Sequence, residues 1–247
     1  MRIERHGTVA LLRVESGKVN AIGPAFVSGL NTLLDGLGDA SAAVITGHGS
    51  AFSAGLDLPS LVELDRPSMY AFIEQFNALM LRVFELPVPL VAAVNGHAIA
   101  GGCVLALQAD IRIAADRDAR IGLNETQLGI GLPAVVLETL RFQVPASSLA
   151  PIALEGRLFS PREALALGLL HEVVPEADLL DKALARAQAL ASLPPAGVRQ
   201  VKAALRRPVT DLIRQIGAAE SGRWVESWLD PASQSRLRAT VARLKKS

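Results

Sequence analysis

The alternation of apolar and polar residues predicts strands in the first half of the chain. Residues 8–15 read TVALLRVE, and the charged stretch RIERH before them is expected to pair with them as a hairpin across Gly7. Short apolar runs within 41–47 and 88–96, each closed by a glycine, are typical of buried strands. Residues 110–116, DIRIAAD, alternate again and predict a further strand.

Helical spacing fills much of the sequence between these strands. Apolar residues recur every three or four positions after Pro24 and again from Pro67 to Leu86, and proline is favoured in the first turn of a helix. Residues 47–58 are rich in small residues and predict a loop. Another loop is expected after Asn95, leading into a helix that begins near Gly101.

Helices dominate the pattern from Pro133 onward. Residues 160–174 begin with Ser160 at the N-cap and Pro161 at the first helical position. Glu163 stands three residues after the cap, which completes a capping box. This segment is therefore expected to start a helix at Pro161.

The C-terminal part of the chain is also expected to be helical. An amphipathic helix is predicted within 176–194, and the arginine-rich tail after it places Trp224 and Trp228 four residues apart on one helix face. Strands alternating with helices, followed by helices alone, predict an α/β fold. We expect an α/β core at residues 1–190 and a C-terminal helical extension at 191–247.

Composition narrows the class of protein. The 247 residues are 50% hydrophobic and 20% charged, which is typical of a well-packed globular chain. The net charge of +1 gives no reason to expect nucleic acid or a membrane surface as the main partner, although a local basic cluster can still bind a small phosphorylated ligand. Cys103 is the only cysteine, so no intrachain disulfide and no cysteine-rich metal site are expected.

The sequence favours a cytoplasmic location. The N-terminus alternates charged and apolar residues and lacks the apolar core of a signal peptide. The long uncharged tract from Leu86 to Ala109 is interrupted by Pro87, Pro89 and Asn95, whereas a membrane helix needs about 20 predominantly apolar residues. We therefore read this tract as a buried strand, a loop and a buried helix.

The glycine-rich segment NGHAIAGGC, residues 95–103, is the first candidate site. Gly96 and Gly101 have the spacing of a phosphate-binding P-loop, but Gly102 and Cys103 replace its Lys and Ser/Thr. A dinucleotide fingerprint is also absent. What remains is a helix start whose free N–H groups can face an anionic oxygen, or a site of tight helix–strand packing.

Two further candidates are a loop and a lone acid. The loop FSAGLDL, residues 52–58, can present the N–H of Leu56, and two converging backbone N–H groups form an oxyanion hole. Glu125 lies in the neutral stretch GLNETQLGIGLP, where it is either a surface residue or a desolvated base. His97 and His171 have no partner at catalytic or metal-ligand spacing, so structural roles are expected for both.

These segments together resemble the crotonase superfamily, also called enoyl-CoA hydratase/isomerase. AFSAGLDL is similar to its first oxyanion loop, and AAVNGHAIAGGCVLALQADIRIAAD is similar to its second. A later segment, 167–174, also resembles the family, so the similarity covers nearly the whole chain. The resemblance implies a ClpP/crotonase-like α/β fold of repeated ββα units with a C-terminal helical extension.

The residue at position 104 narrows the resemblance. Hydratases of the superfamily carry a glutamate directly after the Gly-Gly-Cys motif and a second one further along, whereas this chain has Val104 and then Glu125. An apolar first position and the motif LNETQ resemble the mitochondrial-type Δ3,Δ2-enoyl-CoA isomerases. The resemblance thus implies a single-glutamate isomerase of fatty acid β-oxidation, which converts 3-enoyl-CoA to 2-enoyl-CoA.

The resemblance also implies a set of site residues. Glu125 is the expected base, and the N–H groups of Leu56 and Gly101 are the expected oxyanion donors. The expected substrate contacts are Ala54, Gly55, Leu56, Asp57, Gly101 and Asn124. No cofactor and no metal are expected, because CoA is part of the substrate. Lys18 is either a phosphate contact or a solvated residue.

Other readings remain open at this point. The chain can be an enoyl-CoA hydratase, another acyl-CoA-processing crotonase such as a hydrolase or decarboxylase, or a non-catalytic subunit that binds a CoA thioester. The expected partner is an acyl-CoA thioester, with no nucleic acid and no membrane. The resemblance further implies a homotrimer or a dimer of trimers, with residues 191–247 as the trimerisation region.

Overall fold

Nine strands and their connecting helices form the part of the chain that the computed structural model describes, residues 1–244. The strands are β1 (Arg2–His6), β2 (Val9–Arg13), β3 (Ala42–Thr46), β4 (Ala51–Ser53), β5 (Leu90–Val94), β6 (His97–Ile99), β7 (Ile111–Asp116), β8 (Ile121–Gly122) and β9 (Glu172–Pro175). The helices are α1 (Pro24–Asp35), α2 (Leu58–Leu61), α3 (Arg66–Phe84), α4 (Gly101–Leu107), α5 (Glu125–Leu128), α6 (Ala134–Gln143), α7 (Leu149–Ala153), α8 (Pro161–Ala166), α9 (Leu179–Ala191), α10 (Pro195–Leu229) and α11 (Pro231–Leu244), with 3-10 turns at η1 (Ala146–Ser148) and η2 (Glu176–Asp178).

The main sheet has the order β1-β2-β3-β5-β7-β9. β1 and β2 form the predicted antiparallel hairpin, and the remaining neighbours are parallel. Side chains of a strand alternate between the two faces of a sheet, and both faces are buried at the central strands β2, β3 and β5. In β2, Val9 and Leu11 pack with α9, whereas Ala10 and Leu12 pack in the larger core on the other face.

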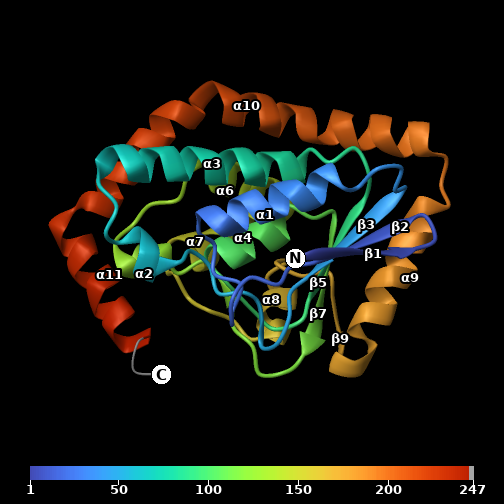
Figure 1. Cartoon of the computed structure of the whole chain (residues 1–247), viewed down its shortest axis with the longest axis horizontal. Helices are drawn as coiled ribbons and strands as arrows, with labels where there is room; N and C mark the ends of the chain where they lie inside the picture. The colour runs from blue at the N-terminus through green and yellow to red at the C-terminus, as the bar shows by residue number, and fades with distance from the viewer. Residues whose placement is uncertain (245–247) are drawn as a thin grey trace.

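The molecule is layered around this sheet (Figure 1). Helix α9 contacts β2, β3, β5 and β7 on one face. The opposite face is covered by α1, α3 and α4, and α10 lies along α3 and α6 on the outside (Figure 1). The core is therefore divided into a small cluster beneath α9 and a large one that extends to the C-terminal helices.

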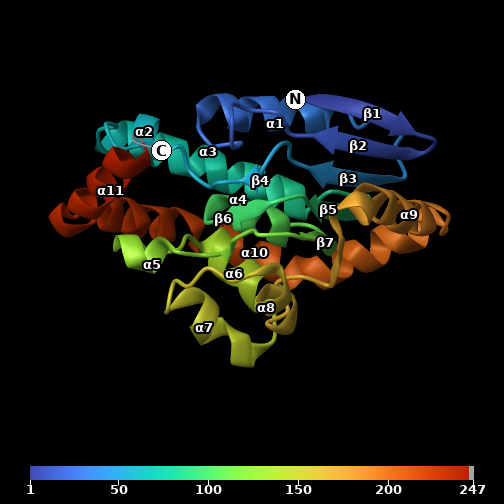
Figure 2. The same ribbon diagram turned by 90° about the horizontal axis from the view of Figure 1, so that it is seen from below.

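A second, three-stranded parallel sheet has the order β4-β6-β8. Its strands each follow a strand of the main sheet, and each is followed by a helix: β3-β4-α2, β5-β6-α4 and β7-β8-α5. These are the predicted repeated ββα units, and Figure 2 shows β4 and β6 beside α4. The three short strands carry the segments that the sequence selected as candidate sites.

The sequence-based prediction missed several short strands. β4 and β6 lie in segments that were predicted to be loops. β9 lies at the end of residues 160–174, a segment for which only a helix start was predicted. β4 and β6 have three residues each, too few to establish a period of two, and their pairing partners are distant in sequence. The capping box itself is confirmed, with Ser160 and Glu163 bonded reciprocally at the start of α8.

The C-terminal region is helical in its described part, and residues 245–247 lie outside the described residues. Helix α10 spans 35 residues with Pro208 inside it. Trp224 and Trp228 lie on one face as predicted and stack with ring centroids 5.3 Å apart. The boundary between residues 190 and 191 stays a prediction. Within residues 1–244, no helix has the length and apolar character needed to cross a membrane.

Candidate active site

The carboxyl ends of the three short parallel strands bring the predicted site segments together. β4 leads into the loop with Leu56, β6 leads into Gly101, and β8 leads into Glu125. Parallel strands end at the same edge of a sheet, and the pairing of β6 with both neighbours fixes their register. The Ala100 N–H donates to Gly122 O at 2.8 Å, which extends the pairing up to the start of α4.

The first loop is held by a backbone bridge to Ile22. The Ile22 N–H donates to Gly55 O at 2.8 Å, and the Asp57 N–H donates to Ile22 O at 3.0 Å. Because successive backbone N–H groups of an extended segment point to opposite sides, the Leu56 N–H points away from Ile22. It has no hydrogen-bond acceptor within residues 1–244.

Gly55 is required by its conformation and by the nearness of the second loop. Its φ of +88° lies in the region that favours glycine. A Cβ there would lie 2.7 Å from Ile99 O and 3.3 Å from the backbone nitrogen of Gly101. The two loops that the sequence selected separately are thus in direct backbone contact.

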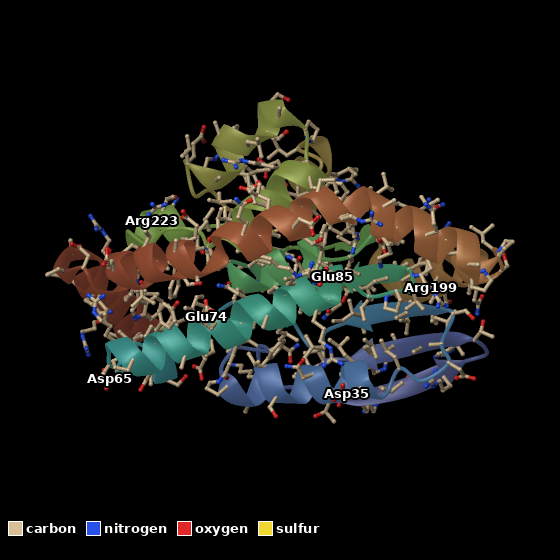
Figure 3. All side chains as sticks on the ribbon, turned by 90° about the horizontal axis from the view of Figure 1, so that it is seen from above. Asp35, Asp65, Glu74, Glu85, Arg199 and Arg223 are labelled. Atoms are coloured by element: carbon tan, nitrogen blue, oxygen red, sulfur yellow. The ribbon has the colours of Figure 1, made fainter. Side chains whose placement is uncertain are left out.

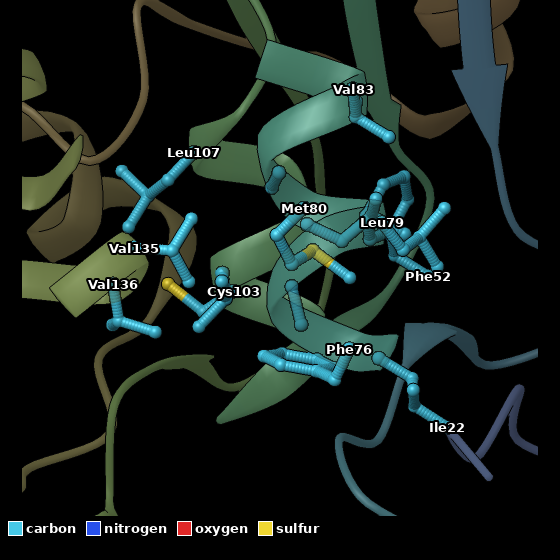
Figure 4. Packing of buried hydrophobic residues seen from close by; sticks show 14 of the residues in the cluster. Ile22, Phe52, Phe76, Leu79, Met80, Val83, Cys103, Leu107, Val135 and Val136 are labelled. Carbon is cyan, nitrogen blue, oxygen red and sulfur yellow. The ribbon is translucent and has the colours of Figure 1, made fainter. Parts of the chain in front are cut away.

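Gly101 is the first residue of α4, so its N–H has no acceptor inside the helix. Ala100 before it has a φ of +51°, a strained conformation for a residue with a side chain. A Cβ on Gly101 would point at Gly55 Cα, 3.6 Å away, and at the side chains of Ile22 and Phe76. Figure 4 shows Phe76 and Ile22 on the same side of the cluster of buried hydrophobic residues that it draws.

Tight packing of α4 is a second role of the glycine pair. A Cβ on Gly102 would lie 2.1 Å from Ser53 O, so only glycine lets α4 lie this close to β4. The packing reading of the segment therefore applies to Gly102. Gly101 faces the first loop, and a contact of its N–H with an anionic oxygen stays a prediction.

Glu125 is the first residue of α5 and is only 8% exposed. Its Oε2 has no hydrogen-bond partner among the described residues. Burial raises the pKa of its carboxyl to about 7, against the opposing effect of the backbone N–H groups of Glu125 and Asn124. The surface reading of Glu125 is therefore wrong, and the carboxyl is desolvated.

The neighbours of Glu125 are apolar or neutral. Burial, and after it the charge of Glu125, raises the pKa of the Cys103 thiol, so Cys103 of α4 lies near the carboxyl. Val104, the next residue of α4, is 1% exposed. Figure 4 shows Cys103 against Val135 and Val136 of α6. The site thus holds one carboxyl in a mostly apolar surrounding.

The remaining predicted substrate contacts lie around the same loops. The Ala54 N–H donates to Val19 O at 3.0 Å, so this N–H is already used. Asp57 accepts from the Ser60 hydroxyl at 2.8 Å. Asn124 has a buried Oδ1 without a partner within residues 1–244, which leaves it free to accept a hydrogen bond.

Sequence reasoning missed the residues that support these loops. Besides Ile22 and Phe76, Ser227 of α10 accepts from the Gly131 N–H at 3.0 Å, and Ser233 of α11 donates to Gly129 O at 2.8 Å. These serines support the segment after α5 from the far end of the chain. Only Phe76 carried a signal, since it is one of the apolar residues at helical spacing between Pro67 and Leu86.

The two histidines behave as expected for structural residues. His97 Nδ1 accepts from the Arg120 N–H, and His171 Nδ1 accepts from the Arg112 N–H, each at 3.0 Å. Burial, followed by the charge of Arg112, lowers the pKa of His171 to about 4. Lys18 is exposed, and its two readings stay open.

Comparison with known proteins agrees with this geometry. The enoyl-CoA hydratase/isomerase family profile matches residues 4–229. A putative enoyl-CoA hydratase of Thermus thermophilus is 35% identical over 208 residues, 82% of this chain and 81% of the relative. Human mitochondrial enoyl-CoA delta isomerase 1 is 31% identical over 243 residues, 96% of this chain and 80% of the relative.

A solved structure extends the similarity to the whole fold. The crystal structure of human mitochondrial Δ3-Δ2-enoyl-CoA isomerase has a TM-score of 0.94 at 30% identity, with 99% of this chain and 98% of that chain covered. The predicted crotonase fold, including its C-terminal helical extension, is confirmed. The chain is therefore an enzyme of the enoyl-CoA hydratase/isomerase family.

Proposed function

We propose that this enzyme is a Δ3,Δ2-enoyl-CoA isomerase, which moves the double bond of a 3-enoyl-CoA to the 2-position. The observation that carries the proposal is the single buried carboxyl of Glu125 at one strand end, while the neighbouring strand ends carry Leu56 and Gly101. Val104 stands where a second carboxyl would be needed for hydration.

The proposed reaction is a proton transfer within one substrate. Glu125 takes the proton from the carbon alpha to the thioester carbonyl, and the electrons of that C–H bond move onto the thioester oxygen as a dienolate. The Leu56 and Gly101 N–H groups donate hydrogen bonds to this oxygen. The neutral Glu125 then returns the proton to the gamma carbon, the carbonyl reforms, and the double bond lies between the alpha and beta carbons.

The environment of Glu125 supports this role. A general base works best when its pKa lies near the working pH, and burial raises that of Glu125 to about 7. General acid–base catalysis contributes roughly 10² to 10⁴-fold, and one oxyanion donor is worth roughly 10² to 10³-fold. Both contributions fit a base and two donors that are held by backbone geometry.

Val104 and its apolar neighbours argue against hydration as the main reaction. Hydration needs a positioned water and a second group to exchange protons with it, whereas the 1% exposed Val104 has no such group. Several relatives are named as enoyl-CoA hydratases, so the rates of isomerisation and hydration need a direct comparison. The proposed isomerisation itself needs no cofactor.

The decisive assay compares both reactions on the purified wild-type protein. We expect 3-enoyl-CoA to be converted to 2-enoyl-CoA, followed by ultraviolet absorbance of the conjugated thioester, faster than 2-enoyl-CoA is hydrated. Faster hydration would assign the enzyme to the hydratases. Binding of acyl-CoA without turnover of either substrate would leave a thioester-binding subunit as the better description.

The oligomeric state and the cytoplasmic location stay predictions. Helix α10 leaves Val201, Leu205 and Leu212 exposed on one face, as expected for a helix that contacts another copy. Sedimentation analysis should give a trimer or a dimer of trimers, and a monomer would contradict the predicted assembly.

A further inference from the structure

A basic groove lies outside the candidate active site, between the end of α3 and the first part of α10. Its volume is about 360 Å³, within the range of small-molecule pockets. Glu85 at the end of α3 and Arg199 near the start of α10 are labelled in Figure 3. The groove is lined by Glu85, Leu86, Pro87, Arg199, Lys202, Ala203, Arg206, Arg207, Thr210, Asp211 and Arg214.

The groove carries more positive than negative charge. Five lining residues are basic, and three carboxylates pair with them. Glu85 and Asp211 both pair with Arg214, and Asp110 pairs with Lys202 and Arg206 from beneath the groove. Two positive charges are therefore left over. Arg199 and Arg207 are exposed, and their guanidinium groups have no hydrogen-bond or ion-pair partner within residues 1–244.

The two basic side chains at the base of the groove are held in fixed positions. The Lys202 Nζ donates to Val88 O and to Asp110, each at 2.7 Å. Arg206 donates to Asp110 and to Phe84 O, and its guanidinium lies 4.1 Å from the centroid of the Phe84 ring. Both side chains are more than nine-tenths buried, so their positions are fixed before a ligand binds.

Burial of Lys202 and Arg206 favours the binding of an anion beside them. Desolvation lowers the pKa of Lys202 to about 8, and the nearby Arg206 lowers it further while Asp110 opposes both. Desolvation also lowers the pKa of Arg206. Taking cations out of water is costly unless opposite charges compensate them, and one carboxylate is shared between these two.

We propose that this groove binds a phosphate group, with Lys202 and Arg206 at its base and Arg199 and Arg207 closing over the anion. A phosphate monoester carries about two negative charges at neutral pH and so matches the two uncompensated cations. Guanidinium groups present paired N–H donors that fit phosphate oxygens. The phosphate comes either from the free ion or from the phosphate end of a nucleotide.

The test uses isothermal titration calorimetry on the full chain, with inorganic pyrophosphate, inorganic phosphate and ADP as separate probes. The variant replaces both exposed arginines, Arg199→Gln with Arg207→Gln, because neither makes a contact that the fold requires. The matched control is Arg186→Gln on α9, which is also exposed but does not line the groove.

We expect at least one probe to bind the wild type and the control equally, and to bind the double variant at least tenfold more weakly. Tighter binding of ADP than of either inorganic ion would identify a nucleotide as the source of the phosphate. Equal binding by all three proteins, or no binding to the wild type, would overturn the proposal. A change in sedimentation of the double variant without a change in affinity would also overturn it, because the groove would then be a contact between copies.

Discussion

Glu125 differs from ordinary surface carboxylates of this protein in what surrounds it. Glu4, for example, is bonded to Arg13 and Arg2, which lower the pKa of its carboxyl. Glu125 has no cationic partner among residues 1–244, and burial raises its pKa instead. A carboxyl with these surroundings is poorly suited to holding the fold together at neutral pH and well suited to taking and returning a proton.

The raised pKa predicts the pH dependence of activity. The base must be ionised to take the alpha proton, so kcat/KM for isomerisation should rise with pH through about 7 and level off above it. Initial rates between pH 5 and 9 measure this profile. A rate that is independent of pH across this range would mean that Glu125 does not titrate as the base in the free enzyme.

The raised pKa of Glu125 also predicts how the free energy of unfolding changes with pH. The change has the opposite sign from that of a carboxylate whose pKa is lowered by folding. The folded pKa lies above the unfolded value of 4.5, so the native state binds more protons between these values. This contribution to stability is fully present below about pH 4.5 and is lost as the pH rises through about 7. Glu125→Gln should therefore stabilise the protein at pH 8, by at most on the order of 3 kcal/mol.

Urea denaturation of wild type and variant at pH 8 and pH 5 checks this expectation. At pH 5 the wild-type carboxyl is protonated in the folded state, so the difference between the two proteins should shrink. A variant that is less stable than the wild type at pH 8 would show that the Glu125 carboxylate contributes to the fold.

At the scale of elements, the site depends on how closely α4 lies against the short sheet. Gly101 and Gly102 are adjacent, yet their surroundings differ. A Cβ on Gly101 meets the end of the Ile22 side chain at 3.2 Å, which can move, whereas one on Gly102 meets the backbone oxygen of Ser53 at 2.1 Å. The two glycines can therefore be separated by experiment.

Gly101→Ala should fold but lose activity, because the methyl group enters the space beside the first loop. A loss of roughly 10- to 100-fold in kcat is expected, below the full effect of removing an oxyanion donor. Gly102→Ala should instead lower stability by about 1–3 kcal/mol or more through overpacking. Thermal denaturation and kinetics on both variants distinguish these outcomes, and equal behaviour of the two would contradict the assigned roles.

The sequence predicted the longer elements and the site segments, but not how the segments meet. The hairpin, the buried strands and the capping box have local signals. The pairing of β6 with β4 and β8 has none, because these strands are short and their contacts join distant parts of the chain. The burial of Glu125 likewise depends on the packing of α5 against α11, a contact between distant parts of the chain that no local pattern encodes.

At the scale of the whole molecule, a buried ionic cluster ties the C-terminal extension to the core. Asp110, directly before β7, accepts from Lys202 and Arg206 of α10 and also from the Leu90 N–H at 2.7 Å. The same α10 carries Ser227, which holds the segment after Glu125. The position of this helix therefore affects both the proposed phosphate groove and the candidate active site.

Asp110→Asn should be strongly destabilising, because it leaves two buried cations without their carboxylate. A loss of about 3–5 kcal/mol in the free energy of unfolding is expected. The control is Asp35→Asn, which removes an exposed pair with Arg82 and should cost at most about 1 kcal/mol. Chemical denaturation in phosphate-free buffer measures both, and similar small losses would show that the buried cluster does not anchor α10.

The central claim is that one carboxyl performs the whole proton transfer, and Glu125→Gln tests it most directly. Glutamine keeps the shape of the side chain but cannot take the alpha proton. We expect kcat for 3-enoyl-CoA isomerisation to fall by roughly 10² to 10⁴-fold with little change in KM, while the exposed-site control Glu155→Gln keeps wild-type rates. Full turnover by the folded Glu125→Gln protein would contradict the proposed mechanism.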